Sequence, residues 1–219
     1  MTVRVSRLAL IELSLFAAVI ALGAPAAVNA FHKVALDDRL APATGRGVTS
    51  EDAARLLGES VQSDAERVDF AFALLGAADA SSIDESDRAA LIAQAAADFR
   101  VYVSRVPGDG AAWAGLASAE LARGDGRRAA DAFVASILAT PWSPSLVAWR
   151  CGLGIDLFNR LDDEGRELLK GQFRLEAQRS VASLVQIVTA RNALRTARIL
   201  LASSPDELQK FEAELARRR

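Results

Sequence analysis

Apolar residues recur at intervals of three and four along most of this chain. Between positions 84 and 106 they include Leu91, Ala95 and Phe99, and the run stops at Pro107. This spacing puts the apolar side chains on one face of an α-helix. No stretch alternates apolar and polar residues for long enough to indicate a β-sheet. The pattern therefore predicts an all-α protein.

Helix-start signals divide the rest of the chain into further expected helices. Ser143 and Ser204, each followed by a proline, are expected to cap the helices they precede, and Trp142 is expected to pack back onto Val147. Another pair of helices is expected on either side of a turn at Asp162. The remaining expected helices span 49–62, 63–76, 84–106, 110–123, 127–139, 180–202 and 205–219.

One stretch has a residue spacing that goes beyond helical periodicity. Large, small and turn residues follow one another there in a fixed order, at Trp113, Leu116, Gly124, Asp125, Ala129, Phe133 and Pro141. This spacing resembles the tetratricopeptide repeat (TPR). In that family two antiparallel helices pack through the large and small positions, a Gly-Asp turn joins them, and the proline stops the second helix. The resemblance predicts a short array of helical hairpins.

The resemblance is imperfect within this repeat but is supported by a second copy. Ala117, Glu120 and Ser136 stand where the family has a small glycine, a tyrosine and a second small residue. The order Ala, Phe, Pro nevertheless occurs earlier as well, with the same internal spacing, at Ala95, Phe99 and Pro107. In the family the first helix of each hairpin lines a concave binding face. The resemblance therefore implies partner contacts at Ala111, Ala114, Ser118, Leu121 and Ala122.

The N-terminal segment, positions 1–30, is expected to meet a membrane. Positions 8–30 are almost entirely apolar and make roughly 34 Å of helix, enough to cross a hydrocarbon core of about 30 Å. A cleaved signal peptide is the alternative, with Val28-Asn29-Ala30 as its small-residue cleavage site. Glu12 lies near the inner end, where it either reaches the interface or contacts another membrane helix.

The basic residues around this segment predict its orientation. Two arginines precede it, whereas the two basic residues that follow are offset by Asp37 and Asp38. This asymmetry favours a cytoplasmic N-terminus and an exported helical domain. Residues 31–48 have no sustained period and are expected to form a linker between the segment at 1–30 and the domain at 49–219.

Composition excludes several classes of function. The chain is 51% hydrophobic and 25% charged with a net charge of -2, which does not indicate nucleic-acid binding. One cysteine and one histidine rule out an intramolecular disulfide and a His/Cys metal cluster. Cys151 is expected to be a buried small residue, and the acids at 162–164 to favour a helix start. We therefore expect no catalytic, cofactor or metal site, and no enzyme.

Three arginines are the most suggestive charged feature. Arg191, Arg195 and Arg198 are spaced four and three apart, so they are expected to share one helix face. They are either a site for an acidic glycan, head group or protein, or a solvated face paired with neighbouring acids. The three tryptophans are expected to be core residues rather than sugar-stacking platforms.

These features together suggest a non-enzymatic scaffold or adaptor. TPR proteins generally assemble other proteins, and a small chain with one membrane helix and a short array also resembles bacterial envelope proteins of surface-polysaccharide export or division machinery. We expect an inner-membrane, single-pass protein with its domain in the periplasm and a protein partner in a membrane-associated complex. The alternatives are a glycan- or lipid-binding accessory protein for polysaccharide export, and a secreted or periplasmic product after signal cleavage.

Overall fold

The computed structural model describes residues 49–58, 63–79 and 82–218. These residues form helices and connecting turns, with no strand among them, which confirms the all-α prediction. Every described helix belongs to one compact unit, Ser50–Arg219. The helices are α2 (Ser50–Leu57), α3 (Asp64–Ala78), α4 (Glu85–Arg105), α5 (Gly110–Ala122), α6 (Gly126–Ala139), α7 (Pro144–Leu157), α8 (Asp163–Ala190), α9 (Leu194–Leu201) and α10 (Pro205–Arg217).

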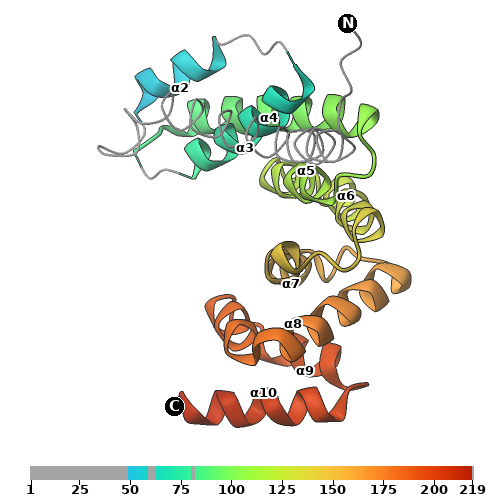
Figure 1. Cartoon of the computed structure of the whole chain (residues 1–219). Helices are drawn as coiled ribbons and strands as arrows, with labels where there is room; N and C mark the ends of the chain where they lie inside the picture. Colours follow the sequence, from blue (N-terminus) through green and yellow to red (C-terminus); the bar gives the residue numbers. More distant parts are fainter. Residues whose placement is uncertain (1–48, 59–62, 80–81, 219) are drawn as a thin grey trace, which may run out of the picture. The chain divides into compact units, whose positions relative to one another are not determined.

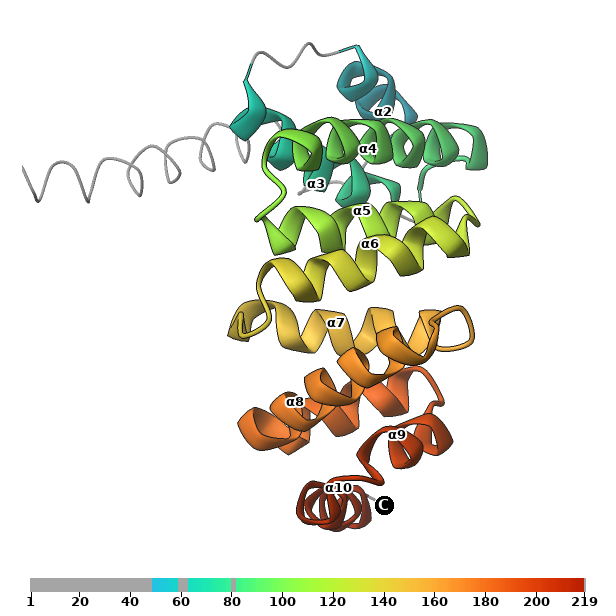
Figure 2. The same ribbon diagram turned by 90° about the vertical axis from the view of Figure 1, so that its right-hand side faces the viewer.

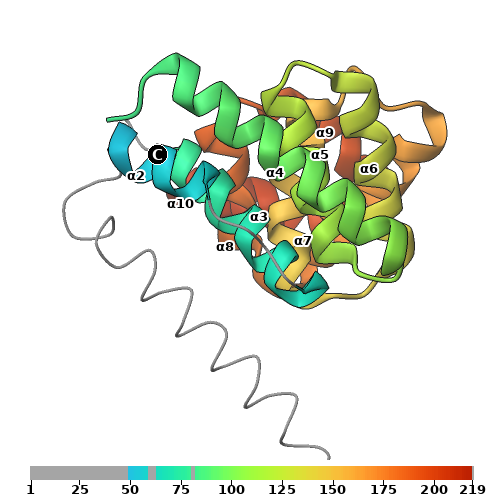
Figure 3. The same cartoon turned by 90° about the horizontal axis from the view of Figure 1, so that it is seen from above.

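Within the unit Ser50–Arg219, each helix from α3 to α9 packs against the next one along the chain, whereas α2 packs on α4 and α10 packs mainly on α8 (Figure 1). The most extensive contacts are within the pairs α3–α4, α5–α6 and α7–α8, followed by α4 on α5. The α4–α5 and α6–α7 turns lie at the same end of these helices (Figure 2). Seen from above, α3 and α7 lie to one side of α4, and α6 lies to the other (Figure 3).

Three of the large and small positions singled out by the residue spacing lie in the interior of the α5–α6 pair: Leu116, Ala129 and Phe133 are buried. Trp113 is only half-buried, and its indole Nε1 donates to the carbonyl of Pro107 at 2.9 Å. The turn between the helices needs its glycine, because Gly124 has a φ of 81°. Asp125 then caps α6, its Oδ1 accepting from the amide of Arg128 at 3.1 Å.

Two expected helices end earlier than the sequence suggested. The expected single helix at 180–202 is wrong, because α8 ends at Ala190 and α9 begins at Leu194. The chain turns there through Asn192, whose φ of 52° suits asparagine better than most residues. Within α8, Ser180 also departs from helical geometry, which marks a kink. The first helix, expected over 49–62, ends at Leu57.

The two serine caps and the tryptophan staple expected before α7 and α10 do not form. Pro144 and Pro205 begin their helices as predicted, but the side chains of Ser143 and Ser204 make no capping hydrogen bond. Trp142 is 72% exposed, so it does not staple onto Val147. A starting proline therefore suffices at both sites, because its fixed φ is already helical.

The predicted membrane segment at 8–30, including Glu12, and the linker at 31–48 lie outside the described residues. Within the part that is described, no helix has the length and apolar character to span a bilayer.

Candidate functional site

A groove of about 500 Å³ lies between α4 and α6, with α5 as its base. Its surface is mainly apolar, with charged groups at one end. The groove is lined by Arg100 of α4, by Trp113, Leu116 and Glu120 of α5, and by Arg128, Asp131, Ala132 and Ala135 of α6.

The apolar part of the groove is held rigidly. Trp113 is fixed by the hydrogen bond from its Nε1 to Pro107, and the start of α5 is capped by Asp109, whose Oδ1 accepts from the amides of Ala111 and Ala112 at 2.9 and 3.0 Å. Tyr102 of α4 donates from its hydroxyl to the other oxygen of Asp109 at 3.1 Å. Burial and the neighbouring Asp109 raise the pKa of Tyr102 to about 12, so the hydroxyl stays a donor.

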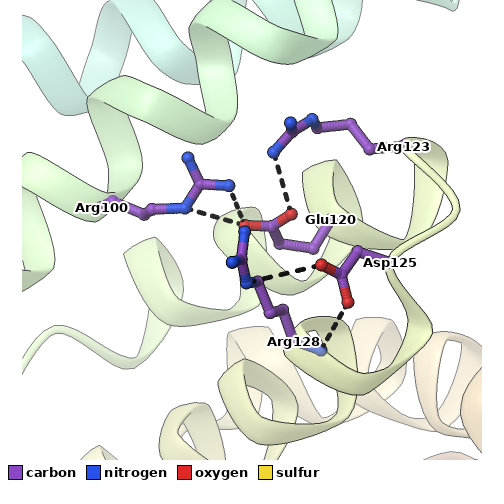
Figure 4. A network of polar contacts seen from close by, with 5 residues as sticks. All are labelled: Arg100, Glu120, Arg123, Asp125 and Arg128. Carbon is purple, nitrogen blue, oxygen red and sulfur yellow. Dashed lines mark hydrogen bonds and ion pairs between the residues drawn. The ribbon is translucent and has the colours of Figure 1, made fainter.

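At the charged end of the groove, Glu120 is only 1% exposed and is bound by two arginines, one from α4 and one from the turn after α5 (Figure 4). Arg100 of α4 donates to Oε1 from Nε at 2.9 Å and also from Nη2. Arg123 donates from Nη1 to Oε2 at 3.2 Å. Because a buried carboxylate needs such partners, Glu120 fixes the guanidinium of Arg100 at the mouth of the groove.

The opposite rim of this end belongs to α6. Nε of Arg128 lies 3.4 Å from Oδ2 of Asp125, yet the arginine side chain remains 63% exposed (Figure 4). Asp131, three positions on, is also exposed and lies on the groove. The rim thus presents one cation and one anion to solvent beside an apolar floor. This arrangement suits the burial of an apolar side chain flanked by polar groups.

The residues implied by a concave binding face lie elsewhere, because none of them lines this groove. Ala114 is fully buried, Ala111, Ser118 and Leu121 are half-buried, and Ala122 is exposed.

The small residues of α5 allow its neighbours to approach closely. Phe72 of α3 lies so near Gly115 that a Cβ there would clash with its ring, and the Phe72 ring centroid is 6.1 Å from that of Trp149 of α7. Ala114, next to Gly115, is fully buried and has no surface left for a partner. Binding at the exposed and half-buried members of the set stays a prediction.

The three predicted arginines do not share one helix face. Arg191 lies in the turn after α8, where its Nε is 3.2 Å from Oδ2 of Asp156 and its guanidinium fills the space beside Gly152. Arg198 of α9 binds Glu212 through two hydrogen bonds, at 2.6 and 3.1 Å. Arg195 is exposed on α9. Two of the three are thus paired with acids, as the solvated-face interpretation anticipated.

The surroundings of Cys151 bear on the expected chemical inertness. Cys151 is fully buried on α7, and desolvation together with Glu176 raises the pKa of its thiol well above the ordinary value. A protonated, buried thiol is a poor nucleophile, so Cys151 has the packing role expected of it. No three His, Cys, Asp or Glu side chains gather as metal ligands in the described part of the chain. The absence of enzymatic activity stays a prediction.

A second cavity, of about 440 Å³, lies near the C-terminal end of the helix array, between α8, α9 and α10. Val185, Leu194 and Leu215 form its apolar wall and Arg218 stands at its edge. Nε of Arg218 donates to Oε1 of Glu214 at 2.9 Å, and the same carboxylate also pairs with Arg217 at 2.7 Å.

One residue in the sequence could have indicated the charged end of the groove. Glu120 occupies the position at which the TPR pattern has a tyrosine, on the face of α5 that packs against its neighbours. A carboxylate there needs a cation from another helix, and Arg100 supplies it. Compared with known protein families, with curated proteins and with solved structures, the chain has no significant match.

Proposed function

We propose that this protein is a non-enzymatic, membrane-tethered scaffold or adaptor of TPR type that assembles or stabilises a bacterial envelope complex, and that the groove over α5 binds its partner. The observation that carries this proposal is the apolar surface of the groove, built from Trp113, Leu116 and the small Ala132 and Ala135. Small residues let a partner backbone approach closely, and the half-buried tryptophan offers a large apolar contact area.

The composition of the groove favours a protein partner over a glycan. A sugar presents many hydroxyl groups that need hydrogen-bonding side chains around them. Of the charged groups that line the groove, Glu120 and Arg100 already bind each other, and Arg123 binds the same carboxylate. The indole Nε1 of Trp113 is also engaged, by Pro107. An apolar protein side chain therefore fits this surface better than a sugar ring.

The TPR part of the proposal is supported by packing. Phe99 and Ala95 are fully buried on α4, as are Phe133 and Ala129 at the corresponding places on α6, in the next copy of the pattern. The helices also pack in consecutive pairs, as a hairpin array requires.

The groove proposal is tested by site-specific photocrosslinking in native membranes. A benzophenone amino acid at position 131, on the exposed rim of the groove, should capture a defined protein. Adding Ala135→Glu, which places a charge in the apolar groove, should remove that crosslink while leaving the helical circular dichroism unchanged. The same photoreactive residue at Gln209, exposed on α10, is the matched control. The proposal fails if position 131 captures lipid or glycan, or the same proteins as position 209.

The membrane-tethered part of the proposal is tested separately. An alkaline phosphatase fused after Arg219 should be active, and a fluorescent protein there dark, because the basic residues before position 8 favour a cytoplasmic N-terminus. Carbonate-washed membranes should retain the chain at full length. Fluorescence from the fused reporter would place the domain in the cytoplasm, and a soluble product beginning at Phe31 would identify a cleaved signal peptide.

A further inference from the structure

Trp142 is the most exposed of the large apolar side chains in the described residues, at 72%, and Leu138 is second, at 58%. Both are close in sequence to the groove. Asp131, Ala135 and Leu138 are spaced four and three apart on α6, so they share one helix face, and Trp142 follows in the next turn. The face of α6 that lines the groove, here called the stripe, therefore continues beyond the groove to Leu138, and Trp142 lies in the turn that follows α6.

A buried arginine on the neighbouring helix holds the turn that contains Trp142. Arg150 of α7 is fully buried, and it donates from Nη1 to the carbonyl of Thr140 and from Nη2 to the hydroxyl of Thr140, both at 2.9 Å. The amide of Gln172 on α8 donates to the carbonyl of Pro141 at 3.3 Å. Trp142 thus extends from a backbone whose preceding two residues are hydrogen-bonded to the core.

Neutral groups hold the buried arginine. The guanidinium of Arg150 donates to the oxygens of Ser136 and Thr140, and no carboxylate of the described residues forms an ion pair with it. Burying a cation in this way is costly, although the carbonyls at the C-terminal end of α6 favour positive charge. These hydrogen bonds hold the backbone next to the exposed Trp142 in place. Less conformational entropy is therefore lost when Trp142 binds a partner.

The charges along the stripe restrict what can cover it. Residues 138–145 contain no charged side chain, which argues against an anionic lipid surface, whereas the other end of the stripe carries Arg128 and Asp131. The stripe from Arg128 to Leu138 is roughly 15 Å long on α6, the length of about three helical turns. An amphipathic helix with apolar residues at i, i+3 or i+4, and i+7 matches both the length and the pattern.

We propose that the partner supplies an amphipathic helix that lies along α6. Its apolar face covers Ala135, Leu138 and Trp142, and its polar end places a carboxylate near Arg128 and a cation near Asp131. Trp142 is the anchor of this contact, as exposed, rigidly held tryptophans often are at protein interfaces. This inference rests on the proposed binding function of the groove and extends the binding surface beyond it.

The test uses the full chain in zwitterionic lipid nanodiscs and a displayed library of helical peptides, each about four to six helical turns long. Selected peptides should carry apolar residues at helical spacing with charges at one end. Trp142→Ala should weaken their binding about thirtyfold, the size expected for an interface hot spot, and Leu138→Ala should weaken it less. Ile199→Ala, which truncates an apolar side chain 48% exposed on α9, is the matched control and should leave binding unchanged.

The alternative outcomes separate this inference from the function on which it rests. If Ala135→Glu abolishes binding and Trp142→Ala does not, the groove binds peptides but the extension to Trp142 is wrong. If neither variant matters, or no helical peptide is selected, both proposals fail. Quenching of Trp142 fluorescence by brominated lipids would make the surface a membrane contact. Loss of self-association in Trp142→Ala would make it a contact between copies of this chain. Either result overturns the proposed partner helix.

Discussion

Arg150 and Ser136 are joined by two hydrogen bonds, from Nε to the serine hydroxyl at 3.0 Å and from Nη2 to the serine carbonyl at 2.5 Å. The same hydroxyl donates to the carbonyl of Gly110 at 2.6 Å. One buried contact therefore links the end of α6 to the start of α5 and the middle of α7. It also supports the turn that presents Trp142.

Replacing Arg150 tests this link. Arg150→Met should lower the free energy of unfolding by about 2 kcal/mol or more, because it leaves buried carbonyl and hydroxyl oxygens without donors, each costing about 1–3 kcal/mol. Urea unfolding measures the change, and time-resolved anisotropy should show faster local motion at Trp142. An unfolding free energy equal to that of the parent would show that the methionine packing replaces the lost hydrogen bonds.

Two glycines provide a matched pair of substitutions. A Cβ on Gly110 would collide with the Thr140 hydroxyl, with Nη2 of Arg150 and with the Ser136 carbonyl, so Gly110→Ala should be destabilising. A Cβ on Gly171, within α8, would meet nothing within 4 Å, so Gly171→Ala should raise stability by up to about 1 kcal/mol through helix propensity. The unfolding temperature should therefore fall for Gly110→Ala and rise for Gly171→Ala. A rise for both variants would contradict the close packing at Gly110.

Phe133 tests the interior of the α5–α6 pair. It is fully buried, so Phe133→Ala should cost about 3–5 kcal/mol of unfolding free energy. Leu138→Ala, on the same helix but 58% exposed, should change stability by less than about 0.5 kcal/mol. Chemical denaturation of the two variants compares a buried with an exposed truncation. Equal losses would be inconsistent with the described position of Phe133.

Glu120 and Arg100 should be energetically coupled. Glu120→Gln removes the charge that Arg100 and Arg123 bind, and a double-mutant cycle with Arg100→Gln should give a coupling of about 1–3 kcal/mol. Arg128→Gln in the same cycle is the control, because Arg128 pairs with Asp125 instead. A coupling near zero would place Glu120 in a solvated setting.

Tyr102 gives a titration that reports a single site, because the chain has one tyrosine. Burial and Asp109 raise its pKa from 10.0 to about 12. The phenol therefore contributes stability that is fully present below pH 10 and is lost as the pH rises from 10 to 12. Absorbance of the phenolate should give a midpoint near 12 for the folded chain and near 10 in denaturant. Asp109→Asn should lower the folded midpoint, and an unchanged value would remove Asp109 as a cause.

The local sequence was sufficient to predict the class of fold and most helix boundaries. Helical periodicity, the proline that begins α7 and the glycine at the α5–α6 turn act within a few residues of themselves, so their effects can be read in order along the chain. Local signals failed in other places, among them the turn at Asn192, which no glycine or proline marks, and Trp142, whose predicted local staple is absent.

The candidate site was decided by tertiary structure. Glu120 and Ser136 were visible in the sequence as departures from the TPR pattern, but their roles depend on Arg100 and Arg150, which other helices bring to them. The concave face implied by the resemblance could not be judged from α5 alone, because α4, α6, α3 and α7 all pack on α5, and Ala114 is fully buried. Spacing along the chain determines which face of a helix a residue occupies, whereas the charge partners and free surface of that face depend on the helices packed against it.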